Sequence, residues 1–131
     1  MKILVVDDEL VSRAKMNKIL EGMGQCTAVD NGKAALVTFK NAIASGKPFN
    51  LITLDISMPD MDGTEVLFEI RQFESEMEVP KFKQTKILMV TSHSDKESIM
   101  TCVQAGCNDY IVKPFNKETI ISKIKSLGIT L

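Results

Sequence analysis

The chain has 131 residues, of which 44% are hydrophobic and 25% charged, and 16 basic against 17 acidic residues leave a net charge of −1. This length and composition predict one globular domain spanning residues 1–131. The balanced charge argues against direct binding to nucleic acid, and no stretch reaches the roughly 18 apolar residues needed for membrane insertion. Three cysteines without a Cys-x-x-Cys pair favour a reducing compartment, so we predict a cytoplasmic protein.

Apolar runs and helical stripes alternate through the first half of the chain. Residues 2–6 and Leu51–Leu54 are continuous apolar runs, as expected of strands covered on both faces, and Cys26–Val29 is a weaker run typical of an edge strand. Helical spacing predicts a first helix over Leu10–Met23, ended by Gly22 and Gly24. The apolar residues of this and the next helix are Met16, Ile19, Leu20, Met23, Ala35, Leu36, Phe39 and Ile43.

The second half of the chain repeats the same alternation. A helix is expected to begin near Asp62-Gly63, and Ile87–Val90 and Tyr110–Val112 are predicted strands. Ser94 or Asp95 is expected to cap a helix that Gly106 ends. The apolar stripes of the three helices are Val66, Leu67, Ile70; Ile99, Cys102, Val103; and Ile120, Ile121, Ile124, Leu127. Five strands alternating with five helices predict an α/β fold, (βα)5, with a doubly wound, parallel, five-stranded sheet.

Charged residues directly follow three of the predicted strands. Asp7 and Asp8 follow the first strand, Asp55 the third, and Lys113 the last. Because the carboxyl ends of parallel strands share one edge of the sheet, these side chains are expected to meet in one pocket. Clustered carboxylates repel one another unless a cation neutralises them, and Mg²⁺ prefers such oxygen ligands together with phosphate. The pattern therefore predicts a Mg²⁺ and phosphoryl site, although Asp8 or Glu9 could instead simply cap the first helix.

Asp55 is the candidate nucleophile of this pocket, because a fixed carboxylate can attack phosphorus to form an acyl phosphate. Lys113 could offset charge on the phosphoryl oxygens, and the following Pro114 allows a cis bond that would set the direction of the lysine. Thr91 ends a strand and could donate to a phosphoryl oxygen. His93, the only histidine, has no evident catalytic partner and is expected to face solvent. No nucleotide-binding motif is present, so the phosphoryl group is expected to come from another molecule.

Four motifs carry a resemblance to a known family. They are Val5-Val6-Asp7-Asp8-Glu9, Leu54-Asp55-Ile56-Ser57-Met58-Pro59-Asp60-Met61-Asp62-Gly63, Val90-Thr91-Ser92 and Tyr110-Ile111-Val112-Lys113-Pro114-Phe115. In this order they closely resemble the receiver domain of two-component response regulators, over essentially the whole chain. The resemblance implies a flavodoxin-like sheet with strand order 2-1-3-4-5, in a single domain similar to the chemotaxis receiver protein.

The resemblance also implies a role for each site residue. Asp55 would be the phosphoacceptor. Asp8, Asp55 and the backbone carbonyl of Ser57 would bind Mg²⁺ directly, with Asp7 acting through water. Lys113 would contact the phosphoryl group. The switch residues would be Thr91, which would move toward the phosphoryl group, and Tyr110, which would turn inward.

The implied function is a phosphorylation-activated signalling switch of a two-component system or phosphorelay. The phosphoryl donor would be a sensor histidine kinase or a histidine phosphotransfer protein. The signal would pass to an unknown downstream protein through the face of the fourth helix, fifth strand and fifth helix. Because no output domain is visible, a stand-alone switch is expected, and a receiver module detached from a longer regulator is the alternative. No enzymatic activity is expected beyond Mg²⁺-dependent self-phosphorylation and autodephosphorylation.

Two other functions compete with this interpretation. An aspartate-nucleophile phosphatase would need an acidic residue two positions after Asp55, where Ser57 stands. A flavodoxin-like binding module would need a phosphate-binding loop where three acidic residues follow the first strand. The chain also departs from the family. The segment Glu74–Lys86 is longer than usual and is expected at the far edge of the sheet. Asn116 stands where the transcription-factor branch has an arginine, which argues against the common dimer of that branch.

Overall fold

The computed structural model describes residues 1–92 and 96–129, and in this part of the chain strands and α-helices alternate strictly. The strands are β1 (Lys2–Val6), β2 (Gln25–Val29), β3 (Leu51–Asp55), β4 (Lys86–Thr91) and β5 (Asp109–Val112). The helices are α1 (Leu10–Leu20), α2 (Gly32–Ala44), α3 (Gly63–Glu76), α4 (Lys96–Ala105) and α5 (Lys117–Ser126), and a 3₁₀ turn, η1 (Lys81–Lys83), precedes β4. The predicted (βα)5 architecture is therefore confirmed.

All pairings between neighbouring strands are parallel, and the strand order is β2-β1-β3-β4-β5, as the resemblance implied. The direction in which successive strands are added to the sheet reverses at β1: β2 lies on one side of it, and β3, β4 and β5 follow on the other. β1 and β3 are direct neighbours, with Val6 opposite Leu54. The crevice at such a reversal is where ligands bind in open α/β sheets. The residues that follow β1 and those that end β3 therefore face the same space.

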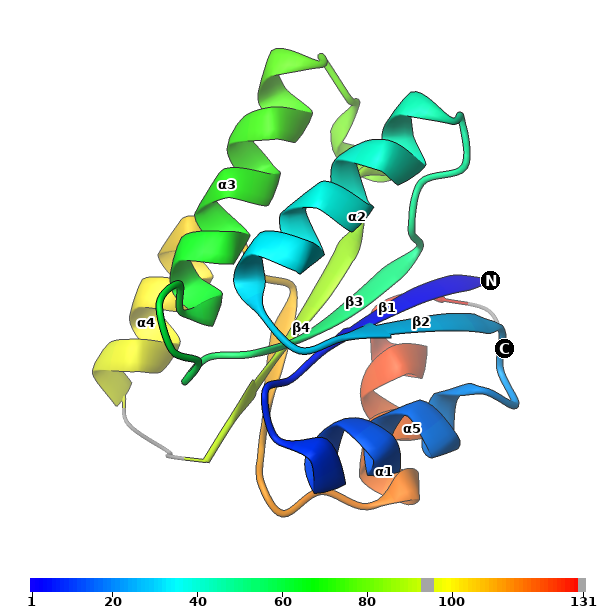
Figure 1. Ribbon diagram of the computed structural model, residues 1–131, viewed down its shortest axis with the longest axis vertical. Coiled ribbons are helices and arrows are strands. Elements are labelled where there is room, and N and C mark those ends of the chain that lie inside the picture. The colour runs from blue at the N-terminus through cyan, green and yellow to red at the C-terminus, as the bar shows by residue number, and fades with distance from the viewer. Residues whose placement is uncertain (93–95, 130–131) are drawn as a thin grey trace.

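Helices cover both faces of the sheet, with α2, α3 and α4 on one side and α1 and α5 on the other (Figure 1). Successive strand residues alternate between the two layers. Leu4 and Val6 pack toward α2 and α3, whereas Ile3 and Val5 pack toward α1 and α5. This two-sided burial explains why the central strands are continuous apolar runs. The edge strand β2 is more exposed, which agrees with its weaker pattern.

Two details differ from the sequence predictions. Helix α1 ends at Leu20 rather than at Met23, because the chain turns there and the Met23 N–H donates to the Leu20 carbonyl at 2.9 Å. Val103 of α4 is 58% exposed, and Cys102 is the residue of that helix that enters the core. The proposed cap residues Ser94 and Asp95 lie outside the described residues.

The segment between α3 and β4 lies at the amino edge of the sheet, opposite the strand ends that carry the aspartates, as predicted. Helix α3 continues to Glu76, a turn with φ of 55° at Glu78 follows, and η1 leads into β4. Among the described residues, no helix is both long and apolar enough to cross a membrane.

Candidate phosphoryl and metal site

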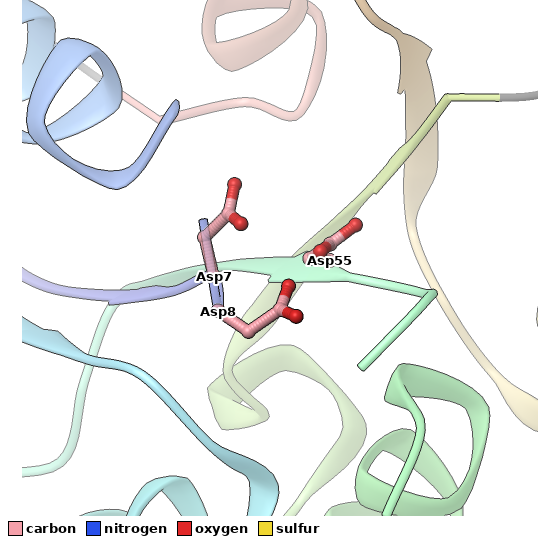
Figure 2. A group of neighbouring side chains, drawn as sticks. All are labelled: Asp7, Asp8 and Asp55. Atoms are coloured by element: carbon pink, nitrogen blue, oxygen red, sulfur yellow. The ribbon is translucent and has the colours of Figure 1, made fainter. Parts of the chain in front are cut away.

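Three aspartates meet where β1 and β3 end. Asp7 and Asp8 directly follow β1, Asp55 is the last residue of β3, and Figure 2 shows their side chains grouped at this edge. One carboxylate oxygen from each lies within 4.8 Å of the others. Asp7 and Asp55 are only 5% and 4% exposed, whereas Asp8 is open to solvent. The predicted convergence of these carboxylates is therefore present.

Lys113 brings a single ammonium to the same pocket. Its Nζ lies 3.2 Å from Asp7 Oδ2 and 3.7 Å from Asp55 Oδ1, with its side chain 13% exposed. Its backbone N–H donates to the Thr91 carbonyl at 2.7 Å, which ties the ends of β4 and β5 together. The Lys113–Pro114 bond is cis, the isomer that the sequence allowed. The short distances from Nζ to Asp7 and Asp55 show that the lysine points into the pocket.

Glu9 is a member of this site that the sequence interpretation treated only as a possible helix cap. It occupies the N-cap position of α1, but its side chain makes no capping hydrogen bond. Instead, its Oε1 accepts a hydrogen bond from Lys113 Nζ at 3.0 Å, which lowers the pKa of the Glu9 carboxyl. The sequence shows Glu9 on the same loop as Asp7 and Asp8, but nothing in it indicates the contact with Lys113, 104 positions away.

Backbone contacts fix Asp7. Its Oδ1 accepts the Glu9 N–H at 2.9 Å, and its carbonyl accepts a hydrogen bond from Arg13 Nη1 at 2.9 Å. The carboxylate is therefore held by the turn into α1, with its second oxygen, Oδ2, facing Lys113.

The loop after Asp55 is held by its contact with the start of α3. Asp62 caps that helix by accepting the Glu65 N–H at 2.9 Å. The next residue, Gly63, lies so close to the strand end that a Cβ there would stand 2.1 Å from the Asp55 carbonyl oxygen. Its N–H donates to the Ile56 carbonyl at 2.7 Å, and Met58 is buried beneath the loop. The Asp-Gly pair thus both starts the helix and lets it approach the site.

Negative charge is in excess in this pocket. Burial raises the pKa of Asp55 to about 7, with the charges of Asp7 and Asp8 adding to the rise and Lys113 opposing it. Burial also acts to lower the pKa of Lys113, but its hydrogen bond with Glu9 and the charges of Asp55 and Asp7 outweigh it, so that the pKa is raised. One ammonium does not neutralise this cluster of carboxylates. A further cation would favour the ionised form of Asp55.

The donor set suits Mg²⁺. Hard oxygen ligands are available from Asp7, Asp8 and Asp55, and the exposed position of Asp8 leaves room for water on the open side. Mg²⁺ usually keeps several waters and binds through only one or two carboxylates, so a group of three aspartates is a compatible donor set.

The structure also places the remaining predicted site residues. Thr91 is 3% exposed at the end of β4, the strand next to β3. Tyr110 is half-buried near the start of β5, with Lys123 Nζ 5.4 Å from its ring centre. Ser57 lies on the exposed loop after Asp55. His93 lies outside the described residues.

A second buried charge cluster, which sequence reasoning missed, stands at the opposite edge of the sheet. Glu74 of α3 is 1% exposed, and its two oxygens accept hydrogen bonds from Arg71 Nη1 at 2.6 Å and from the Thr85 N–H at 2.9 Å. The guanidinium also donates to the Gly106 carbonyl and to Asn108 Oδ1. The i,i+3 spacing of Arg71 and Glu74 was visible in the sequence, but it is equally typical of solvated helix surfaces.

Comparison with known proteins agrees with this geometry. The family model described as "Response regulator receiver domain" matches residues 3–125. Chemotaxis protein CheY-3 of Vibrio cholerae is 33% identical over 97% of this chain and 91% of its own length. Hybrid signal transduction histidine kinase L of Dictyostelium discoideum is 35% identical over 97% of this chain, which spans only 7% of that relative. The solved receiver domain of the Arabidopsis thaliana histidine kinase CKI1, complexed with Mg²⁺ and BeF₃⁻, superposes with a TM-score of 0.79 at 31% identity, covering 95% of this chain and 89% of that one.

Proposed function

Since this chain belongs to the response regulator receiver domain family, we propose that it is a phosphorylation-activated switch in which Asp55 accepts the phosphoryl group. The observation that carries the proposal is the convergence of Asp55, two further aspartates and the Lys113 ammonium at one sheet edge. We propose residues 1–131 as one receiver unit acting in the cytoplasm. The relatives include both a protein of similar length and a much longer kinase, so either a stand-alone switch or a module of a longer regulator fits the proposal.

The proposed reaction is in-line transfer from phosphohistidine. A carboxylate oxygen of Asp55 forms a bond to phosphorus while the phosphorus–nitrogen bond breaks and the imidazole of the donor leaves. Asp55 must be ionised to attack, and the rise of its pKa to about 7 works against this in the absence of a cation. Lys113, 3.7 Å from Asp55, is placed to donate to a phosphoryl oxygen once the group is attached.

We propose that Asp8, Asp55 and the Ser57 carbonyl hold Mg²⁺, with Asp7 acting through water. When bound, Mg²⁺ would offset the charge of the carboxylates and of the phosphoryl oxygens. The three-aspartate cluster and the Mg²⁺ complex of the CKI1 receiver domain support this assignment.

The switch itself is proposed to involve Thr91 and Tyr110. Thr91 lies beside the site and is linked through its carbonyl to the backbone of Lys113, so a change at the phosphoryl group can reach β5. Phosphorylation would bias a two-state equilibrium in which Tyr110 turns inward and the α4–β5–α5 face changes its partner affinity. The donor is proposed to be a sensor histidine kinase or histidine phosphotransfer protein. The downstream partner is proposed to be a protein.

The test is incubation with acetyl phosphate and Mg²⁺, followed by intact-mass analysis. We expect one added phosphoryl group, stable in acid and labile in base, that is absent in Asp55→Asn and retained in Asp60→Asn. Asp60 is a matched control because it is exposed in the same loop and its φ of 68° suits asparagine. Phosphate that persists in Asp55→Asn would overturn the assignment. Rapid multiple turnover of phosphate esters would instead support the aspartate-nucleophile phosphatase.

A further inference from the structure

The amino edge of the sheet carries a surface that the proposed phosphoryl chemistry does not use. We propose that this surface docks an acidic segment of a partner protein that carries an apolar side chain. It is formed by Lys81, Phe82 and Lys83 of η1 together with Gln84 and Lys86, and we call these residues the basic edge. The proposal concerns the opposite edge of the sheet from Asp55 and does not depend on phosphorylation.

The backbone of the basic edge is anchored by hydrogen bonds. Within the turn, the Lys83 N–H donates to the Pro80 carbonyl at 2.8 Å. On the far side, Thr85 is anchored by three contacts: its N–H donates to buried Glu74, its hydroxyl donates to the Phe49 carbonyl, and its own carbonyl accepts from Arg71. The backbone of the turn is therefore held in place, which reduces the part of the entropic cost of binding that comes from ordering the backbone.

Phe82 projects from this anchored turn into solvent. It is 79% exposed, more than any other aromatic residue in the described part of the chain. Phe82 lines a hollow of about 470 Å³ whose wall also includes the apolar residues Phe49, Pro48 and Ile129. An exposed phenyl ring on an anchored turn, beside a partly apolar hollow, offers a surface against which an apolar side chain of a partner can pack.

Positive charge lies on part of the surface around this ring, whereas on another side Lys83 shares a hollow with Glu74 and Glu78. Lys83 and Lys86 line the hollow beside Phe82, and a second hollow of about 420 Å³ is lined by Arg71, Lys81 and Lys86. Among the described residues, neither wall contains an aspartate or glutamate. In the same part of the chain Lys81, Lys83 and Lys86 form no ion pair, unlike Lys113 and Lys123.

The charge and shape together favour an acidic protein segment. The chain as a whole has a net charge of −1, so positive charge concentrated here is a local feature that attracts a negative partner. Gln84 and Lys86 line both hollows, which are therefore adjacent and suit carboxylates spaced along an extended segment with an apolar residue between them. A flat bilayer would not enter them. A nucleic acid would call for several stacking rings and free arginines, whereas Phe82 is a single ring and Arg71 is already bonded to Glu74.

The test measures binding of a fluorescein-labelled acidic octapeptide, EDLEEFDE, to the full chain by fluorescence anisotropy. We expect saturable binding that weakens with added salt. The double variant Lys81→Glu/Lys86→Glu should weaken binding at least about tenfold, and Phe82→Ser, which keeps every charge, roughly threefold or more.

A matched control separates local from overall charge. Lys33→Glu/Lys117→Glu changes the net charge by the same amount, but these lysines are exposed at the starts of α2 and α5, at the other edge of the sheet. We expect this variant to bind the peptide with an affinity within about twofold of that of the parent chain, because salt screens charges that lie far from the basic edge. Circular dichroism melting of every variant shows that any loss is not a loss of fold.

Four results would overturn the proposal. The first is equal binding by the parent chain and the Lys81→Glu/Lys86→Glu variant. The second is an equal loss in the Lys33→Glu/Lys117→Glu control. The third is tighter binding of phosphatidylserine vesicles or of poly-uridine than of the peptide. The fourth is a dimer in sedimentation velocity that the basic-edge variant dissociates, because a second copy would then be the occupant. On adding the peptide, amide chemical-shift changes confined to residues 81–86 and to the other residues that line the two hollows, such as Phe49 and Ile129, would support the proposal.

Discussion

The two edges of the sheet treat buried carboxylates in opposite ways. At the amino edge, both oxygens of Glu74 receive a hydrogen bond, and Arg71 supplies the compensating charge. At the carboxyl edge, the Lys113 ammonium forms ion pairs with Asp7, Glu9 and Asp55 beside the further carboxylate of Asp8, and burial raises the pKa of Asp55 to about 7. The balanced cluster holds α3, β4 and the loop before β5 together. The unbalanced cluster carries uncompensated negative charge and would be stabilised by a bound cation, which is a property that a phosphoryl and metal site needs.

The largest effect is expected from removing Glu74 at the amino edge. Glu74→Ala should lower the free energy of unfolding by about 3 to 5 kcal/mol, because it leaves a largely buried guanidinium and the Thr85 N–H without their partner. Urea unfolding measures the change. Glu76→Ala, an exposed neighbour on the same helix, is the control and should change stability by less than about 0.5 kcal/mol. A small loss in Glu74→Ala would mean that the cluster does not hold the fold together.

The next largest effect concerns the packing that positions Asp55. Gly63→Ala should destabilise the chain by about 1 to 3 kcal/mol, because the new Cβ would stand 2.1 Å from the Asp55 carbonyl oxygen and the helix start must shift. Phosphorylation by acetyl phosphate should slow as well. Gly22→Ala is the matched control, since nothing lies within 4 Å of a Cβ there. If both alanine variants unfold at the same urea concentration, the close approach at Gly63 is not needed.

A smaller effect is expected on how the free energy of unfolding depends on pH, to which Asp55 at the carboxyl edge contributes. The folded state holds the Asp55 proton more tightly than the unfolded chain does, since the pKa rises from 3.8 to about 7 on folding. Ionising Asp55 therefore destabilises the folded state. This destabilisation is absent below pH 3.8 and grows as the pH rises toward about 7. Without divalent cations, the free energy of unfolding should therefore fall by about 2 kcal/mol between pH 5 and pH 8.

Asp55→Asn and saturating Mg²⁺ should each flatten this pH dependence, the first by removing the titrating group and the second by favouring its ionised form. Glu74→Gln should leave the slope of the pH dependence in place. A pH profile of the parent chain that is already flat without cations would show that the carboxyl edge is not short of positive charge.

The sequence was sufficient for the fold because the pattern of each element agrees with its two-sided burial. Leu4 and Ile52 belong to continuous apolar runs because both faces of the sheet are covered, and such runs predict buried strands. The motif around Asp55 predicted that the site lies at the carboxyl edge of the sheet. The end of α1 was placed too late, because Met23 continues the apolar stripe after the chain has already turned. The spacing of apolar residues along a helix does not reveal such a turn.

The parts that the sequence could not predict are contacts between distant side chains. The bond between Glu9 and Lys113 joins residues 104 positions apart, and Arg71 reaches Asn108 across 37. Neither residue type nor spacing distinguishes these from exposed charges. The fully buried Glu74 is the clearest case, because a glutamate near the end of an amphipathic helix is usually solvated.

The shortage of positive charge around Asp55 is measured most directly by titrating its carboxyl carbon by nuclear magnetic resonance, with and without Mg²⁺. We predict a pKa near 7 in cation-free buffer, raised by burial and by the charges of Asp7 and Asp8, and a clear fall when Mg²⁺ saturates the site. A pKa near the ordinary aspartate value without Mg²⁺, or a pKa that Mg²⁺ does not change, would contradict the claim that the carboxyl edge lacks enough positive charge to neutralise its carboxylates.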